Sequence, residues 1–525
     1  MYLKNRTNAN LWLTLLQSIR ILGNIQVARA ASSSWEECMK NTRHRMFTGP
    51  LISPLISPLI SPLIGAALAV MAASTALAAP EAPKIDTGDT AWMLVSSALV
   101  MLMTPGLAFF YGGLVRAKNS LNMMMMSFIA LGLVSVVWAV LGYSLAFTPA
   151  DTGNLIPGII GGFGFAFMNG VTPDTVHPQA TTIPHPIFMM FQAMFAIITP
   201  ALISGAVADR MKFKTYIAFI ALWSLFVYSP LAHMVWSNDG FLFKLGALDF
   251  AGGTVVHISA GVSALVAAII LGPRRGFGRV AMAPHSVPLT LLGVGLLWFG
   301  WFGFNAGSAL GANGLAANAF VTTNFGAAAA MLTWALLEMF RGGKITAVGA
   351  GTGAVVGLVA ITPAAGFVSP MSAILIGAIG AIVSYSAMQL KGRLTNLDDS
   401  LDVFFCHGLG GMTGAILTGV FAQKTYNSAI AGGLLDGNAG QLGIQILSVL
   451  VAASLAAVGT GVILSVLKAV MGLRASSQDE ELGLDISDHG EAAYHGGEYG
   501  VSGSGVSLGA SVTMPAVTRA ANAGD

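Results

Sequence analysis

Between Ala91 and about Gly472 the chain is a succession of long apolar runs. Each run is close to the ~20 residues that an α-helix needs to cross the ~30 Å hydrocarbon core of a bilayer. Runs of this length in lipid are helical, because only helices and closed barrels satisfy their backbone hydrogen bonds there. Eleven runs occur, at roughly 91–114, 120–147, 186–208, 213–236, 250–272, 286–308, 318–340, 345–364, 370–390, 401–423 and 440–470. The sequence therefore predicts an all-α polytopic membrane protein with eleven transmembrane helices in a lipid bilayer.

The composition agrees with this class and excludes others. Hydrophobic residues make up 55% of the 525 residues and charged residues only 9%, whereas soluble domains carry about 25% charged residues. A soluble enzyme is therefore excluded. With 25 basic and 23 acidic residues, the chain lacks the positive excess that nucleic-acid binding needs. Its two cysteines exclude a disulfide scaffold and a Cys-rich metal site, and no cofactor is expected.

The basic residues of the loops predict an orientation. Cytoplasmic loops are enriched in Lys and Arg, and here the loops after the odd-numbered runs hold nearly all of them. Those loops contain Arg116, Lys118, Arg210, Lys212, Lys214, Arg274, Arg275, Arg279, Arg341, Lys344, Lys391 and Arg393, and the other loops contain Lys244 and Lys424. We therefore predict a multi-pass protein of the inner (plasma) membrane, with the mature N-terminus outside and the C-terminus in the cytoplasm.

Three regions differ in composition, and we treat them as residues 1–79, 80–472 and 473–525. The first has a basic start, an Ile-Ser-Pro-Leu repeat over Leu51–Ile64, and an apolar stretch that closes with Ala76-Leu77-Ala78. We interpret it as an extension with a cleaved signal peptide, with Met46 as an alternative start and a disordered leader as the alternative interpretation. The membrane domain follows, and 473–525 is an acidic cytosolic tail with a Gly/Ser/Ala-rich end. The match of Gly505–Gly509 to G-x-S-x-G is attributed to chance, since no strand precedes it.

An internal repeat indicates a site inside the membrane. Asp249 precedes His257 by eight residues at the start of the fifth span, and Asp399 precedes His407 by eight at the start of the tenth. Two blocks of five spans must be inverted relative to each other, and transporters built this way bind substrate near the midplane. Eight residues of helix put each His about 12 Å below its Asp, so the two histidines approach the middle from opposite sides. The alternatives are a His that bonds a neighbouring helix and an Asp that only caps one.

Several aromatic residues are expected at the outer mouth. Phe191 and Phe195 share one face of the third span, the fourth span ends at Trp236, and the sixth ends in Trp301–Ser308. With Asp249 at the same level, these residues predict an aromatic cup with one hydroxyl and one nearby carboxylate. Ring faces attract a small cation by ~0.5–2 kcal/mol each. The alternative is the aromatic belt common to membrane proteins.

These motifs resemble the ammonium transporter (Amt) family, the relatives of Rh proteins, and the bacterial type in particular. The resemblance covers about Ala91–Tyr494. It rests on Phe109-Phe-Tyr-Gly-Gly-Leu114, Phe191-Gln-Ala-Met-Phe-Ala-Ile-Ile-Thr199, Ala232-His-Met-Val-Trp236, Gly246-Ala-Leu-Asp-Phe-Ala-Gly-Gly-Thr-Val-Val-His257, Gly300-Trp-Phe-Gly-Phe-Asn-Ala-Gly-Ser308, Asp402-Val-Phe-Phe-Cys-His-Gly408 and Gly483-Leu-Asp-Ile-Ser-Asp-His-Gly-Glu491. The resemblance implies a homotrimer in which each subunit has eleven spans and its own pore.

The family's functional positions are all filled here by the expected residue types. The resemblance implies an ammonium recruitment site at Phe191, Trp236 and Ser308 with the acidic residue Asp249, a phenyl gate at Phe195 and Phe304, and twin pore histidines at His257 and His407. The internal repeat adds Asp399 as the inner counterpart of Asp249. Trp236 favours the Amt branch over the Rh branch. The N-terminal extension and the tail beyond Tyr494 fall outside the resemblance.

The resemblance implies an ammonium transporter and channel for nitrogen uptake, not an enzyme. Ammonium, or its analogue methylammonium, is recruited outside and deprotonated, and ammonia crosses a hydrophobic pore past the histidines. A separate proton route makes transport electrogenic. The alternatives are an ammonium sensor or transceptor and an Rh-like ammonia gas channel, and the tail is a candidate docking site for a PII-type signal-transduction protein. A membrane scaffold and a metalloenzyme were also considered, and the absence of H-E-x-x-H disfavours the latter.

Overall fold

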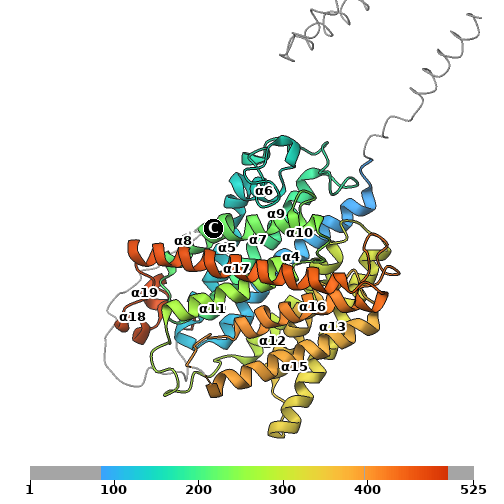
Figure 1. Ribbon diagram of the computed structural model, residues 1–525. Coiled ribbons are helices and arrows are strands. Elements are labelled where there is room, and N and C mark those ends of the chain that lie inside the picture. The colour runs from blue at the N-terminus through green and yellow to red at the C-terminus, as the bar shows by residue number, and fades with distance from the viewer. Residues whose placement is uncertain (1–83, 395, 495–525) are drawn as a thin grey trace, which may run out of the picture. The chain divides into compact units, whose positions relative to one another are not determined.

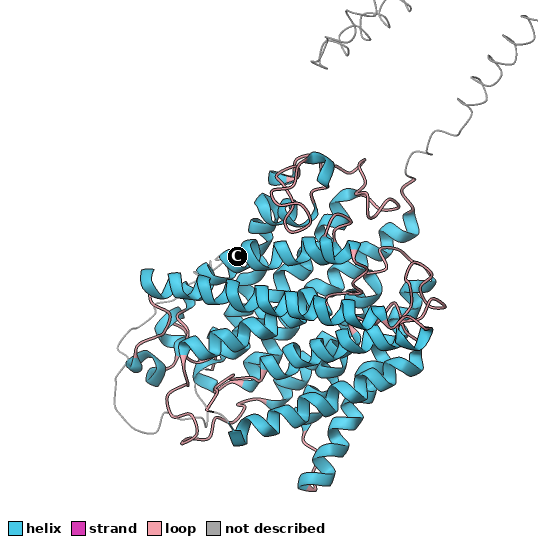
Figure 2. Cartoon of the chain, in the orientation of Figure 1, coloured by secondary structure: helices cyan, strands magenta, loops and turns pink. Residues whose placement is uncertain are grey.

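The computed structural model describes residues 84–394 and 396–494, and these are built from helices and loops without strands (Figure 2). The signal-peptide prediction for residues 1–79 and the end of the tail, 495–525, lie outside the described residues. The membrane helices are α4 (Thr87–Leu114), α5 (Ser120–Val137), α6 (Tyr143–Phe147), α7 (His185–Val207), α8 (Phe213–Trp223), α9 (Ser229–Trp236), α11 (Ser259–Leu271), α12 (Val287–Gly307), α13 (Gly314–Gly342), α14 (Ala347–Ile361), α15 (Pro370–Leu394), α16 (Gly410–Phe421) and α17 (Gly440–Val470).

Short π-helical turns join or extend some of these helices, so the segments form eleven membrane-crossing units within the described residues. The turns are η2 (Trp138–Gly142) between α5 and α6, η5 (Ser224–Tyr228) between α8 and α9, η6 (Gly253–Ile258) before α11 and η7 (Phe404–Leu409) before α16. Ten units are long and apolar enough to cross a bilayer, and α14 is a shorter apolar helix. The prediction of eleven transmembrane helices is therefore confirmed.

Helix α14 is short because of the residue that follows it. Its last residue is Ile361, and the next two are Thr362 and Pro363. Proline lacks the amide hydrogen that would continue the helical hydrogen bonds, and its ring clashes with the preceding turn. The chain therefore turns after Ile361, before the end of the apolar run at residue 364.

Close packing of the first and sixth spans depends on glycine. A Cβ atom on Gly293 of α12 would lie 2.2 Å from the amide nitrogen of Phe110 in α4, and one on Gly113 would lie 2.5 Å from Oγ1 of Thr290. Small residues let membrane helices approach this closely. The resulting van der Waals contacts stabilise the helix pair, because the hydrophobic effect does not drive helix association within lipid. These two helices open the two five-span blocks.

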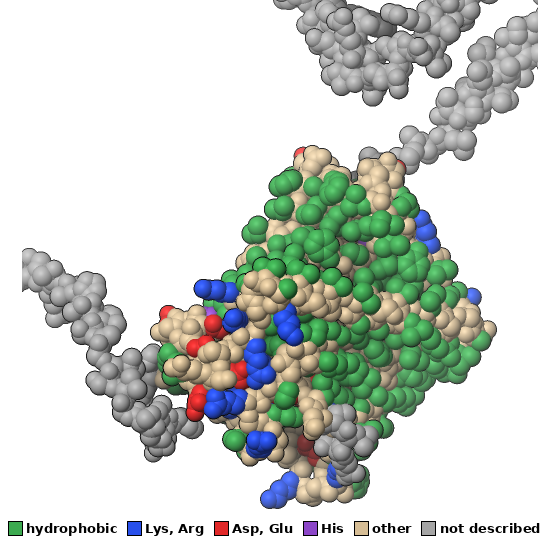
Figure 3. Space-filling view, turned by 60° about the vertical axis from the view of Figure 1, so that its left-hand side comes forward, with side chains coloured by type: hydrophobic (Ala, Val, Ile, Leu, Met, Phe, Trp, Pro, Cys, Tyr) green, Lys and Arg blue, Asp and Glu red, His purple; other side chains and the backbone are tan. Residues whose placement is uncertain are grey.

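The outer surface of the membrane domain is apolar, and charge gathers at one end. Figure 3 shows hydrophobic side chains over most of one face, with most of the Lys, Arg, Asp and Glu side chains collected together. Helix α17 crosses the bundle beside α11 and α16 (Figure 1). The helices α18 (Ser477–Leu482) and α19 (Leu484–His489) follow it and dock onto the start of α5, where Asp485 accepts from the amides of Leu121 and Asn122 at 3.1 and 2.7 Å.

Candidate functional site

The two histidines of the internal repeat lie next to each other in the middle of the bundle. Nδ1 of His257 and Nδ1 of His407 are 3.2 Å apart and share a hydrogen bond. Their ring centroids are 5.3 Å apart with the planes inclined by 24°, and both side chains are buried. One ring nitrogen of the pair donates and the other accepts. Two neutral imidazoles thus form a short hydrogen-bonded chain at the point where the repeats meet.

Both histidines stand on π-helical turns. His257 lies in η6 and His407 in η7, each directly before the α-helix that completes the span. A π turn carries one extra residue and is found mostly at functional sites, because it shifts a side chain relative to the regular helix. The spacing Asp-x₇-His signalled the repeat in the sequence, but nothing in it signalled the π turns.

Glycines four residues after each histidine let the two turns touch. A Cβ on Gly261 would lie 2.1 Å from the amide nitrogen of Gly408, and a Cβ on Gly411 would lie 3.0 Å from Cβ of His257. The contact is reciprocal, since each glycine faces the histidine segment of the other half. The pattern His-x₃-Gly occurs in both copies and was a sequence signal for this crossing that our reasoning missed.

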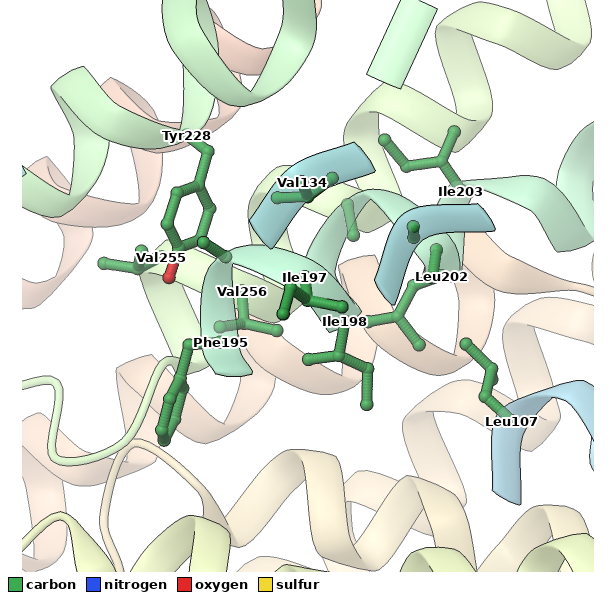
Figure 4. Packing of buried hydrophobic residues seen from close by; sticks show 14 of the residues in the cluster. Leu107, Val134, Phe195, Ile197, Ile198, Leu202, Ile203, Tyr228, Val255 and Val256 are labelled. Carbon is green, nitrogen blue, oxygen red and sulfur yellow. The ribbon is translucent and has the colours of Figure 1, made fainter. Parts of the chain in front are cut away.

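A narrow apolar chamber lies beside the imidazoles. It has a volume of about 10 Å³, which is close to the space that one water-sized molecule needs. It is lined by Met103, Leu107, Phe110, Ile198, Leu202, Val256, His257, Leu297, Trp301, Phe304, Val355 and His407. Figure 4 shows Ile198 and Leu202 on the same side of α7, with Leu107 nearby. His257 also stacks on Trp301, with ring centroids 5.4 Å apart.

Two phenyl rings close one end of this chamber. The ring centroids of Phe195 and Phe304 are 4.3 Å apart, and both side chains are fully buried. Phe304 lines the apolar chamber, and Phe195 lines a second cavity on the other side of the pair. The two residues predicted as the gate are therefore in contact, and they separate two cavities.

The second cavity, which we name the outer vestibule after the predicted orientation, has a volume of about 100 Å³. It is lined by Phe147, Gln179, Phe188, Gln192, Phe195, Trp236, Phe250, Ser308 and Leu310. Of the four predicted recruitment residues, Trp236 and Ser308 line it. Phe191 and Asp249 do not: the Phe191 ring packs behind Phe195 at a centroid distance of 4.9 Å.

The carboxylate of Asp249 is occupied by backbone amides. Oδ1 accepts from Gly252 and Gly253 at 2.9 and 2.6 Å, and Oδ2 accepts from Thr254 and Val255 at 2.9 and 3.0 Å. These are the four amides at the start of a helix that have no partner within the helix itself. Asp249 thus caps η6, and the backbone carbonyl of the same residue accepts from Nε1 of Trp236 at 3.0 Å.

The sequence reasoning missed the two glutamines of the outer vestibule. Gln192 directly follows Phe191 in an apolar span, and a polar side chain there was itself a signal of function. Gln179 belongs to the loop before α7, where spacing gave no signal. Its Nε2 donates to the carbonyl oxygen of Trp236 at 2.6 Å.

The inner counterpart of Asp249 is bonded differently. Oδ2 of Asp399 accepts from the amide of Phe404 at 2.8 Å, whereas Oδ1 has no hydrogen-bond partner within residues 84–394 and 396–494. Asp402 forms an ion pair with Lys391. Asp402 and His407 line a third cavity of about 180 Å³, which we name the inner vestibule. Within the described residues no group of three His, Cys, Asp or Glu side chains is placed to hold a metal ion.

Comparisons with known proteins agree on one family. Residues 91–494 match the model of the Ammonium Transporter Family. The chain is 48% identical over 410 residues to an ammonium transporter of Bacillus subtilis, covering 78% of this chain and 99% of that protein. It is 51% identical over 417 residues to an ammonium transporter of Aquifex aeolicus, covering 78% and 94%.

Two solved structures are similar in fold. The crystal structure of Saccharomyces cerevisiae Mep2 superposes with a TM-score of 0.70 at 37% identity, covering 75% of this chain and 89% of that one. A structure described as a sensor Amt protein gives a TM-score of 0.70 at 32% identity, covering 77% and 98%.

Proposed function

Because this chain belongs to the ammonium transporter family, we propose that it recruits ammonium in the outer vestibule, deprotonates it at the phenyl pair and conducts ammonia past the twin histidines. The observation that carries this proposal is the hydrogen-bonded pair His257 and His407 beside an apolar chamber of about 10 Å³, directly behind Phe195 and Phe304. The proton follows a separate route, so transport moves charge.

Recruitment relies on ring faces and a hydroxyl. Trp236 and Phe195 face the outer vestibule, and each ring face is worth ~0.5–2 kcal/mol to a cation. The Ser308 hydroxyl donates to the carbonyl of Phe304 at 2.8 Å, which leaves its oxygen lone pairs for an N–H donor. Phe191 supports the Phe195 ring from behind, and the backbone carbonyl of Asp249 holds the Trp236 indole by accepting from its Nε1.

The apolar chamber selects against charge. A cation without water in an apolar space is costly, whereas neutral ammonia carries no such penalty. Potassium has the charge of ammonium but no proton to lose, so it stops at the phenyl pair. The imidazole pair supplies hydrogen-bonding nitrogens within the chamber and connects it to the inner vestibule through His407.

The test is charge movement in proteoliposomes after ammonium addition. We expect His257→Ala and His407→Ala to lose the proton-coupled current, or to conduct with weakened selectivity against potassium. His285→Ala is the matched control, because His285 bonds the carbonyl of Val115 and lines neither the chamber nor the two vestibules. Wild-type current and selectivity in both pore variants would contradict the relay.

Two alternatives give different results in the same vesicles. An Rh-like gas channel would alter internal pH on ammonium addition without moving charge. A sensor or transceptor would bind methylammonium and accumulate little of it, an alternative favoured by the structural likeness to a protein described as a sensor Amt. Methylammonium uptake together with current distinguishes all three.

We further propose the setting in which this activity occurs. The protein is a homotrimer in the inner membrane, its mature N-terminus lies outside after cleavage of a signal peptide within residues 1–79, and residues 80–472 form the membrane domain. The cytosolic tail, 473–525, lies at the cytoplasmic face, where a PII-type protein has access to the inner vestibule.

A further inference from the structure

We propose that the amide side chains of Gln192 and Gln179 are substrate-positioning residues that accept N–H hydrogen bonds from ammonium in the outer vestibule. This inference rests on the proposed function and adds to it the groups that bind the cation's protons. Ammonium has four N–H donors and no acceptor. A site for it therefore needs oxygen acceptors as well as ring faces.

The other acceptors near the vestibule are already used. Both oxygens of Asp249 accept from backbone amides, two on each oxygen. Nε1 of Trp236 is a donor only and already bonds the carbonyl of Asp249. Ser308 contributes one hydroxyl oxygen. A cation with four donors thus meets one acceptor among the predicted recruitment residues.

Gln192 supplies a second acceptor. Its side chain lines the outer vestibule, and its Oε1 is shielded from solvent without a hydrogen-bond partner among residues 84–394 and 396–494. A buried amide oxygen left without a partner is destabilising, because it has lost its bonds to water. Rotation of the terminal amide exchanges the oxygen and nitrogen positions, so the oxygen can turn to an N–H donor that enters the cavity. Binding of ammonium relieves this cost.

Gln179 supplies a third acceptor, with a fixed orientation. Its Nε2 donates to the carbonyl of Trp236 at 2.6 Å. Because this bond fixes the position of the nitrogen, the amide oxygen is the group that is left to accept from a ligand. Its backbone amide donates to Nδ1 of His177 at 3.3 Å, so the loop that carries it is held in place. The vestibule thus has acceptors from α7, from the loop before α7 and from the end of α12.

Neutral acceptors suit a site that must release its cation. A hydrogen bond from a charged donor to an amide oxygen is stronger than one between neutral groups, and this is enough to orient the ion. A carboxylate at the same place would add full Coulomb attraction and hold the ion in the vestibule. Potassium has no N–H donors to give to these acceptors.

The experiment measures ammonium-dependent current in proteoliposomes for Gln192→Leu and Gln179→Leu. We expect the KM for ammonium to rise by about tenfold in each variant, with the maximal current within about twofold of wild type. Gln192→Met, which keeps the length and packing of the side chain without its amide oxygen, should raise the KM as Gln192→Leu does, whereas a residue with only a packing role would leave the KM unchanged in this variant. Gln389→Leu, at the cytoplasmic end of α15, is the matched half-buried glutamine control and should leave the KM unchanged.

The outcomes separate this inference from the proposed function. Wild-type KM in both leucine variants overturns the inference and leaves transport intact, whereas no wild-type current overturns the proposed function. If a leucine variant does not fold, Gln192→Met decides: a raised KM supports the acceptor role, and an unchanged KM overturns it.

Discussion

The two halves of this protein, which we call outer and inner after the predicted orientation, use the same pair of residues in two different ways. Asp249 and Asp399 stand eight residues before their histidines, and both are buried. Asp249 accepts four backbone amides with its two oxygens. Asp399 accepts the amide of Phe404 on one oxygen and has no partner for the other within the described residues. The outer acid is a saturated helix cap, and the inner acid is a partly bonded one.

The surroundings of the two acids also differ. Near Asp399 lie a second carboxylate, Asp402, and the ammonium group of Lys391, which bonds Asp402 and the carbonyl of Asp399. Burial, together with the charge of Asp402, raises the pKa of Asp399 to about 6. The same repeat therefore provides a rigid anchor on one side and a titratable group on the other. Shared sequence spacing did not imply shared chemistry.

The largest effect we predict is the loss of stability when the outer acid, Asp249, is removed. Asp249→Ala leaves four buried amides unpaired, and each unpaired amide costs about 1–3 kcal/mol. We therefore expect the free energy of unfolding to fall by about 4 kcal/mol or more. Asp399→Ala removes one bonded oxygen and should cost about 1–3 kcal/mol. Thermal unfolding of both purified variants in the same detergent measures the difference. Equal losses would show that the two caps are equivalent and that our comparison is wrong.

An intermediate loss of stability is expected at acidic pH from protonation of His177, in the loop before α7. Burial and the neighbouring His185 lower the pKa of His177 to about 4, although the hydrogen bond between Nε2 and the carbonyl of Phe147 opposes this shift. Since the unfolded pKa is about 6.5, this stability is fully present above pH 6.5 and is lost as pH falls through about 4, by ~3 kcal/mol in full.

The measurement is the unfolding temperature between pH 7 and 4.5, with His177→Phe as the comparison. Phenylalanine retains the stacking on Phe188, whose ring centroid is 4.4 Å from that of His177, but cannot take up a proton. We expect the unfolding temperature of this variant to fall less between pH 7 and 4.5 than that of the wild type. An identical pH profile in wild type and variant would assign the acid sensitivity elsewhere.

The smallest effect concerns the inner acid and has the opposite sign. The folded pKa of Asp399 is raised to about 6 from an unfolded value near 3.8, so its contribution is present below pH 4 and lost as pH rises through 6. The positive charge of Lys391 lowers this pKa, and Lys391→Met should raise it further. In this variant the loss of stability should continue to a higher pH than in the wild type, and the additional loss should be less than about 1 kcal/mol. Lys344→Met, on the loop after α13, is the control, and a profile like that of the control would contradict the coupling.

The sequence by itself determined the architecture. Lipid imposes helices on long apolar runs, and the uneven Lys and Arg content of the loops gave a consistent count, so eleven spans followed without any tertiary contact. The matched Asp-x₇-His segments likewise predicted the inverted repeat. The predicted depth of about 12 Å assumed eight residues of α-helix, whereas the helical segment before His257 begins only at Gly253 and is a π turn.

Only the tertiary structure decided which side chains lie next to each other in the site. Depth along a helix says nothing of lateral distance. The 3.2 Å contact between His257 and His407 depends on the π turns and on Gly261 and Gly411, each of which packs against the histidine segment of the other half. The same limit explains the outer vestibule. Helical spacing placed Phe191 and Phe195 on one face, but packing by other helices turned Phe191 behind its neighbour and exposed Gln192 to the cavity. Periodicity defines a face, whereas the neighbours that the fold brings to that face define the site.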